Sequence, residues 1–199
     1  MALRATARED VRMLPLRTGP RQSEATEPAQ ALADCHERIR HFTTVALRLA
    51  RSSQASPRLI VDTVSALRRY FGSALPLHER DEEDSVTPRL LEVRPGRAIE
   101  HALARMAGDH RAIDETMGAL DGLWARIAAR PGDLGALGGE LHTRALALSS
   151  LFEGHLQLEE ETIFPAITEL LPEASRKLML RDIRERRTSE IRKAGDPLR

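Results

Sequence analysis

The chain is poor in residues on which several protein classes depend. It holds a single cysteine, Cys35, among 199 residues, which excludes an intrachain disulfide and is typical of a reducing compartment. Aromatic residues make up 3% of the chain, against 41% hydrophobic residues in all. A core of this composition must consist of Leu, Ala, Ile and Val, which favours packed helices over a β-sandwich. The sequence therefore predicts an all-α fold.

An excess of charge and a long apolar run are also lacking. Thirty basic and thirty acidic residues cancel, so no global charge draws the protein to nucleic acid or to a membrane. Charged residues interrupt every apolar run of the first 25 residues, unlike a secretory signal, and no stretch of 18 apolar residues is present that could span a bilayer. We therefore expect a cytoplasmic protein with no nucleic-acid or membrane partner, and the sequence indicates no particular protein partner.

Breaker residues divide the chain into segments. Residues 1–25 show no lasting periodicity and are expected to form a mobile N-terminal tail. Four apolar-periodic segments follow within residues 26–172, separated by SSQASP, RPG and RPGD. A Thr26–Pro28 start predicts the first helix, to about Arg51, and Ser56 is the expected N-cap of the second. Because the connections are short, neighbouring helices should be antiparallel, in an up-down-up-down four-helix bundle.

An extra C-terminal helix is expected over residues 173–199. This segment carries nine basic and five acidic residues. Interspersed charge usually marks a solvated helix face, and we expect Leu178, Met179 and Ile183 to pack on the bundle. The alternative is a basic surface for nucleic acid or an acidic partner.

One sequence motif occurs twice in the chain. It reads HERDEEDSVTP from His78 and HLQLEEETIFP from His155. Each copy has Glu at four and five residues after the His, and Pro at ten. Another His precedes each copy, His36 by 42 residues (78 minus 36) and His110 by 45 (155 minus 110). Residues i and i+4 project from one helix face about 5–6 Å apart, so each His and its Glu can hold metal.

The residue types suit a transition metal. Imidazole nitrogen and carboxylate oxygen together bind iron, zinc or manganese, whereas calcium prefers oxygen alone. Taken singly, each His could be a core histidine hydrogen-bonded to a neighbour. Burial of four His and two Glu without a metal, however, would leave many buried polar atoms without a partner. A two-metal site with two imidazoles on each ion and two bridging carboxylates is the simplest allocation, and it leaves coordination positions for a small ligand. The predicted ligands are His36, His78, Glu82, His110, His155 and Glu159.

With these motifs, residues 28–172 resemble the hemerythrin-like HHE cation-binding family. The resemblance implies a four-helix bundle around a non-haem centre of two iron ions, with an oxo bridge, and makes zinc or manganese the less expected metals. It also implies terminal ligation by the four His and bridging by Glu82 and Glu159. Oxygen-carrying members add a fifth His, but Asp114 stands four residues after His110, so either this carboxylate substitutes or the position is open to solvent.

Three functions follow from the resemblance and the pattern. The first is a non-haem di-iron protein that binds or senses O2, NO or peroxide, in oxygen binding or stress response. The second is a di-iron enzyme in oxidative or nitrosative stress defence or iron-centre repair. The absence of a Glu-x-x-His pair speaks against a ferritin-like oxidase, and the absence of a further His in SQASPRL and of Cys in the tail speaks against the repair role. The third is a metal-free helical interaction module.

Several neighbouring residues have two interpretations. Glu83 and Glu160 either accept hydrogen bonds from ligand imidazoles or face water. Cys35 should point about 100° away from its neighbour His36 and pack as an ordinary small residue, with redox sensing as the alternative. Pro76 must kink or restart the second helix just before the first ligand pair. The three remaining histidines are expected at the surface or rim: His41, His101 and His142.

Overall fold

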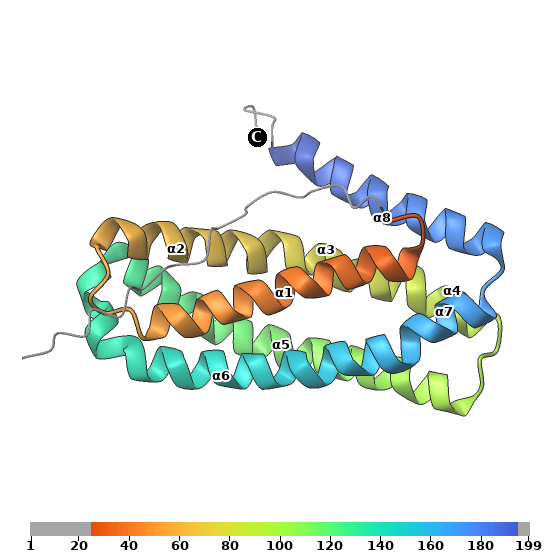
Figure 1. Cartoon of the computed structure of the whole chain (residues 1–199), viewed down its shortest axis with the longest axis horizontal. Coiled ribbons are helices and arrows are strands. Elements are labelled where there is room, and N and C mark those ends of the chain that lie inside the picture. The colour runs from red at the N-terminus through yellow and green to blue at the C-terminus, as the bar shows by residue number, and fades with distance from the viewer. Residues whose placement is uncertain (1–24, 195–199) are drawn as a thin grey trace, which may run out of the picture.

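The computed structural model describes residues 25–194, and every regular element in that range is a helix. Four limbs lie side by side and an eighth helix crosses them (Figure 1). The first limb is α1 (Pro28–Ala50). The second contains α2 (Pro57–Arg69), η1 (Tyr70–Ala74), α3 (Leu75–Asp81), η2 (Glu82–Val86) and α4 (Thr87–Glu92). The third is α5 (Arg97–Ala129). After the turn η3 (Pro131–Asp133), the fourth contains α6 (Leu134–Leu158), η4 (Glu159–Ile163) and α7 (Phe164–Leu170). Helix α8 (Glu173–Ala194) completes the fold. The all-α bundle with an extra C-terminal helix is confirmed.

The helix boundaries follow the breaker residues. The Ser56 side chain accepts a hydrogen bond from the Leu59 amide at 3.3 Å, which confirms the predicted cap. Gly96 adopts a φ of 89°, a conformation that glycine tolerates, and separates the second limb from α5. Thr26 does not cap α1, since Glu27 holds the N-cap position and makes no side-chain cap bond. The predicted N-terminal tail, apart from residue 25, lies outside the described residues.

Three π-helical turns interrupt the limbs, each ending two residues before a proline. They are η1 before Pro76, η2 before Pro88 and η4 before Pro165. Proline has no N–H to bond the carbonyl four residues earlier, and its ring clashes with that carbonyl. One wider turn relieves the clash without ending the helix. The expected kink at Pro76 thus takes the form of η1. The proline of each copy of the repeated motif produces a π-turn, which begins at Glu82 in one copy and at Glu159 in the other.

The buried apolar side chains form two clusters. One, at the end of the bundle where α1 meets α2, is built around residues such as Leu67, Leu120 and Trp124. The other, beneath α8, is built around Leu32, Met106 and Ile167. Along every limb the predicted ligands fall between stretches that belong to the two clusters. The polar layer is therefore sealed at both ends by apolar packing.

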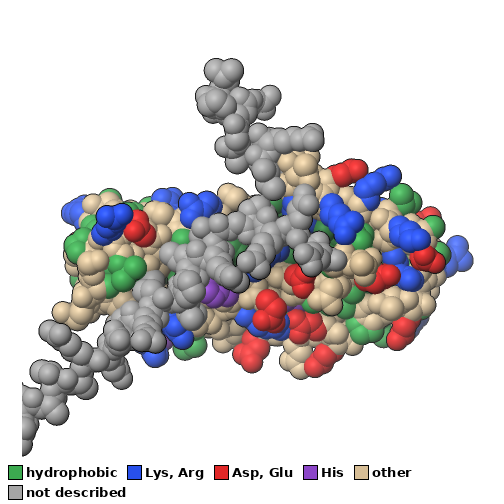
Figure 2. All heavy atoms as spheres, turned by 45° about the horizontal axis from the view of Figure 1, so that its top comes forward, with side chains coloured by type: hydrophobic (Ala, Val, Ile, Leu, Met, Phe, Trp, Pro, Cys, Tyr) green, Lys and Arg blue, Asp and Glu red, His purple; other side chains and the backbone are tan. Residues whose placement is uncertain are grey.

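Helix α8 docks through one face. Met179, Leu180 and Ile183 are buried in the second cluster, whereas the Leu178 side chain is 46% exposed. The prediction for Leu178 was wrong because the docked face is rotated by one residue. Basic and acidic side chains alternate over the right half of the face in Figure 2, where α8 lies, and do not form one basic patch. In the described part of the chain, no helix is both long and apolar enough to cross a membrane.

Candidate metal centre

Six polar side chains meet in the layer between the two apolar clusters. They come from all four limbs, and every one of them is at most 4% exposed: His36, His78, Glu82, His110, His155 and Glu159. These are the six residues that the sequence predicts as ligands. Buried charge at this density is rare unless it is paired or bound to metal.

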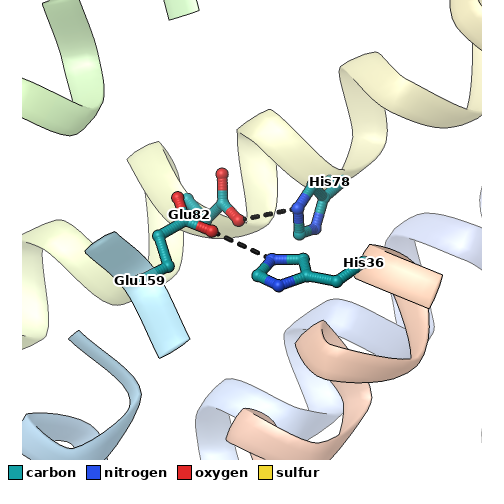
Figure 3. A group of neighbouring side chains, drawn as sticks. All are labelled: His36, His78, Glu82 and Glu159. Atoms are coloured by element: carbon teal, nitrogen blue, oxygen red, sulfur yellow. Dashed lines mark ion pairs between the residues drawn. The ribbon is translucent and has the colours of Figure 1, made fainter. Parts of the chain in front are cut away.

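The six residues form two overlapping groups that could each hold one ion. His36 and His78 share the first group with both glutamates, and His110 and His155 share the second with the same two glutamates. Within each group the ligand atoms all lie within 4.8 Å of one another. Figure 3 shows the first group, with His36 Nε2 2.9 Å from Glu159 and His78 Nε2 2.9 Å from Glu82. Only the fold determines that the imidazoles pair in this way and that both pairs share the same two carboxylates.

The donor atoms face one another without satisfying one another. His36 Nε2, His78 Nε2, Glu82 Oε1 and both carboxylate oxygens of Glu159 are buried and have no hydrogen-bond partner, although their separations are short enough for one. These atoms belong to the His36–His78 group, whose ligand atoms all lie within 4.8 Å of one another. Leaving such atoms unpaired costs about 1–3 kcal/mol each. The residues therefore fit a pair of metal ions, which would satisfy them together.

The two glutamates have opposite electrostatics in the metal-free protein. Burial raises the pKa of Glu82, but the charge of His78 and the hydrogen bond from His110 outweigh it, so this pKa lies well below its ordinary value. Burial and the neighbouring charge of Glu82 raise the pKa of Glu159 well above its ordinary value. Two carboxylates in one site cannot both ionise freely, so Glu159 releases its proton at a higher pH than Glu82 does.

The four imidazoles divide in the same manner. Burial lowers the pKa of His36 to about 4 and that of His155 to about 3, so both are neutral at pH 7. For His110 the bonds to Glu82 and Glu83 outweigh burial and raise its pKa to about 9. Burial lowers the pKa of His78, but other interactions, chiefly with the charge of Glu82, outweigh it and raise this pKa well above its ordinary value. Each group thus combines one imidazole of lowered pKa with one of raised pKa.

Outer partners orient the ligand rings. Glu160 accepts from His36 Nδ1 at 2.7 Å, and Arg40 holds the same carboxylate at 2.8 and 2.9 Å. On the opposite side of the layer Glu83 accepts from His110 Nδ1 at 2.9 Å. Both glutamates therefore take the first of the two interpretations that the sequence left open. Such partners fix which ring nitrogen faces a metal.

The remaining two rings have less obvious partners. Asp109 lies 3.9 Å from His155 Nδ1, and His78 Nδ1 is buried without a hydrogen-bond partner, with the Cys35 thiol nearby. Cys35 is 5% exposed and accepts from Arg38 at 3.0 Å and from Arg187 at 3.2 Å. Burial raises the pKa of the Cys35 thiol, but His78 and the two guanidiniums outweigh it and bring that pKa to about 6. Cys35 is a free, buried residue, as expected, but its contacts with two guanidinium groups were not predicted from the sequence.

Other candidates stay outside the centre. Asp114 is exposed and belongs to neither ligand group, so it does not replace a fifth histidine. The three remaining histidines also lie outside both groups and are exposed or partly exposed, as expected: His41, His101 and His142. Sequence reasoning missed Asp81, which is fully buried beside the ligands. Its signal was an aspartate at i+3 from His78, on nearly the same helix face.

Comparison with known proteins agrees with the geometry. No curated protein matches the chain. The family model described as the hemerythrin HHE cation binding domain matches residues 27–167, a range that contains all six predicted ligands and ends before α8. The overlapping His and Glu groups are the arrangement that a cation-binding domain requires. The chain therefore belongs to the hemerythrin HHE cation-binding domain family.

Proposed function

We propose that the protein holds two iron ions between four imidazoles and two bridging carboxylates, and that this centre binds O2, NO or peroxide. His36 and His78 would be terminal ligands of one ion, and His110 and His155 of the other. Glu82 and Glu159 would bridge the pair. The observation that carries the proposal is that four buried histidines and two buried glutamates form two overlapping groups, each with its ligand atoms within 4.8 Å of one another and several of them without a hydrogen-bond partner.

The protein's own groups prepare the centre in three ways. Burial keeps His36 and His155 neutral, with their lone pairs available. Glu160 and Glu83 hold ring N–H groups and turn the opposite nitrogens inward. The apolar clusters exclude bulk water from both ends. Two iron ions would supply redox-active Lewis-acid positions with room for an external ligand, since each group offers four protein donors and iron accepts five or six.

A small ligand suits this site better than a large substrate. All six predicted ligands are at most 4% exposed, so a diatomic molecule or peroxide fits the space far more easily than an organic substrate. A His-rich donor set also favours reversible ligand binding over the hard oxidation chemistry of carboxylate-rich centres. Binding or sensing is therefore the function that these residues support best.

Elemental analysis of protein purified without air tests the proposal. We expect about two irons per chain, and a visible absorption spectrum that changes on exposure to air, NO or peroxide. Glu82→Ala and Glu159→Ala should each lose at least one metal, whereas Glu161→Ala, which alters an exposed side chain in the same turn as Glu159, should lose none.

Two results would contradict the proposal in different ways. If no metal binds after reconstitution with iron, zinc or manganese, the bundle is a metal-free helical interaction module. If two metals bind but none of the three small molecules changes the spectrum, the metal site stands and the ligand-binding function fails.

A further inference from the structure

Helix α8 lies outside the matched family range, yet it reaches the residues beside the metal ligands. Arg187 carries this contact. Its Nη1 forms an ion pair with Asp81 at 2.7 Å, and its Nη2 donates to Cys35 Sγ at 3.2 Å. Only 11% of the Arg187 side chain is exposed. One guanidinium therefore joins α8 to α3 and to α1.

Both partners of Arg187 are next to predicted ligands. Cys35 directly precedes His36 on α1, and Asp81 directly precedes Glu82. The Cys35 thiol also lies close enough to His78 to affect its charge, although His78 Nδ1 has no hydrogen-bond partner. Neighbouring contacts hold this cluster from other sides. Arg186 donates to Asp81 at 2.6 Å and to Ser85 at 2.6 Å, and Arg38 donates to Cys35 at 3.0 Å.

The two metal positions consequently have different surroundings. Behind His110 and His155 stand carboxylates of the bundle itself, Glu83 and Asp109. Behind His78 stands a thiol held by guanidinium groups, one of which comes from α8. The carboxylate behind His36 is itself paired with Arg40. Negative charge close to a ligand imidazole strengthens it as a metal donor, whereas guanidinium charge opposes a cation.

We propose that Arg187 is a positioning residue of the His36–His78 metal position, which makes the two positions inequivalent and couples docking of α8 to metal binding there. The guanidinium is a planar fork whose two N–H groups reach both Asp81 and Cys35, and it sets the spacing of α1 and α3 where they present their ligands. A lysine keeps the charge but cannot span both partners. The inference rests on the proposed function only in that the centre must bind two metal ions.

Metal titration of the full chain tests the positioning role. Fe²⁺ without air, or Co²⁺ as a coloured probe, is added to metal-free wild type, Arg187→Lys and Arg181→Ala. Arg181 is the matched control, because it lies on the same helix, is 62% exposed and contacts only acidic residues of α8. We expect two binding steps in wild type and in the control. In Arg187→Lys one step should weaken by about 10–100-fold, the usual effect of losing an outer partner of a metal ligand, and the other should change less than about threefold.

Hydrogen exchange provides the second readout. Coupling between α8 docking and metal binding is reciprocal, so metal should slow amide exchange around Ile183 in wild type more than in Arg187→Lys. Cys35→Ser, which leaves Arg187 and Asp81 in place, serves as a second variant if Arg187→Lys does not fold, and it should weaken the same binding step.

The outcomes separate the inference from the proposed function. Wild type that binds no metal overturns both. Wild type that binds two ions, with both steps unchanged in the variants or weakened equally, overturns the inference alone. A purely structural role for Arg187 would lower the melting temperature of the metal-free variant without changing either binding step.

Discussion

Glutamine substitutions at Glu82 and at Glu159 should have different effects on the stability of the metal-free protein. Burial and the charge of Glu82 raise the pKa of Glu159 well above its ordinary value, so Glu159 holds a proton in preference to Glu82. Glu159→Gln should therefore change the charge of the site less than Glu82→Gln does. Glu82, whose pKa is lowered, lies 2.9 Å from His78 and 3.1 Å from His110. Glu82→Gln removes the carboxylate that raises the pKa of both imidazoles.

The expected magnitudes differ accordingly. Loss of one partner from a buried ion pair costs about 3–5 kcal/mol, and release of protons from the imidazoles reduces this loss. We therefore expect Glu82→Gln to lower the free energy of unfolding by about 3 kcal/mol. Glu159→Gln should stay within about 1 kcal/mol of wild type, the value of an ordinary hydrogen bond. Both variants should lose most of the stabilisation by metal, which amounts to about 2.7 kcal/mol at a metal concentration 100 times the Kd.

Urea unfolding, followed by helical circular dichroism at pH 7 with and without chelator, measures these differences. Glu161→Gln is the control, since it makes the same substitution at an exposed position in the turn that begins at Glu159. Equal destabilisation of the two chelated variants, or a larger loss in Glu159→Gln, would refute the assignment of the proton to Glu159.

Three further predictions concern packing, pH and the outer partners. A Cβ at Gly138 would meet the Ala50 carbonyl oxygen at 2.8 Å, so Gly138→Ala should destabilise the protein by about 1–3 kcal/mol. Gly139 has open space around it, so Gly139→Ala should stabilise the protein by about 0.5–1 kcal/mol. Thermal unfolding compares the two variants. Metal affinity should rise with pH from pH 7 to 9, by up to about tenfold per unit, because metal must displace the proton of His110 below its pKa of about 9. A titration series with pH-independent affinity would contradict this. Glu83→Gln should weaken metal binding by about tenfold, and an affinity equal to that of wild type would show that the bond to His110 does not orient the ring.

The sequence determined the elements and the ligand types. Proline and glycine breakers define the limbs, and the i,i+4 spacing of His78 and Glu82 places both on one helix face, since these are local consequences of helix geometry. The same local reasoning named the six residues that the fold brings together in two groups.

Rotation and crossing of the limbs decided the rest. Which imidazoles share a group depends on how four helices turn toward one another, and helical spacing along one chain segment does not contain that information. The π-turns were missed because the proline of each copy of the motif acts on a carbonyl four residues earlier. This effect shifts the hydrogen-bond register of the helix within the ligand-bearing limb. Cys35 was correctly placed beside His36, but only the crossing of α8 brings Arg187 to its sulfur. Spacing within a segment is set by the backbone, whereas contacts between segments are set by packing, and the surroundings of this centre belong to the second kind.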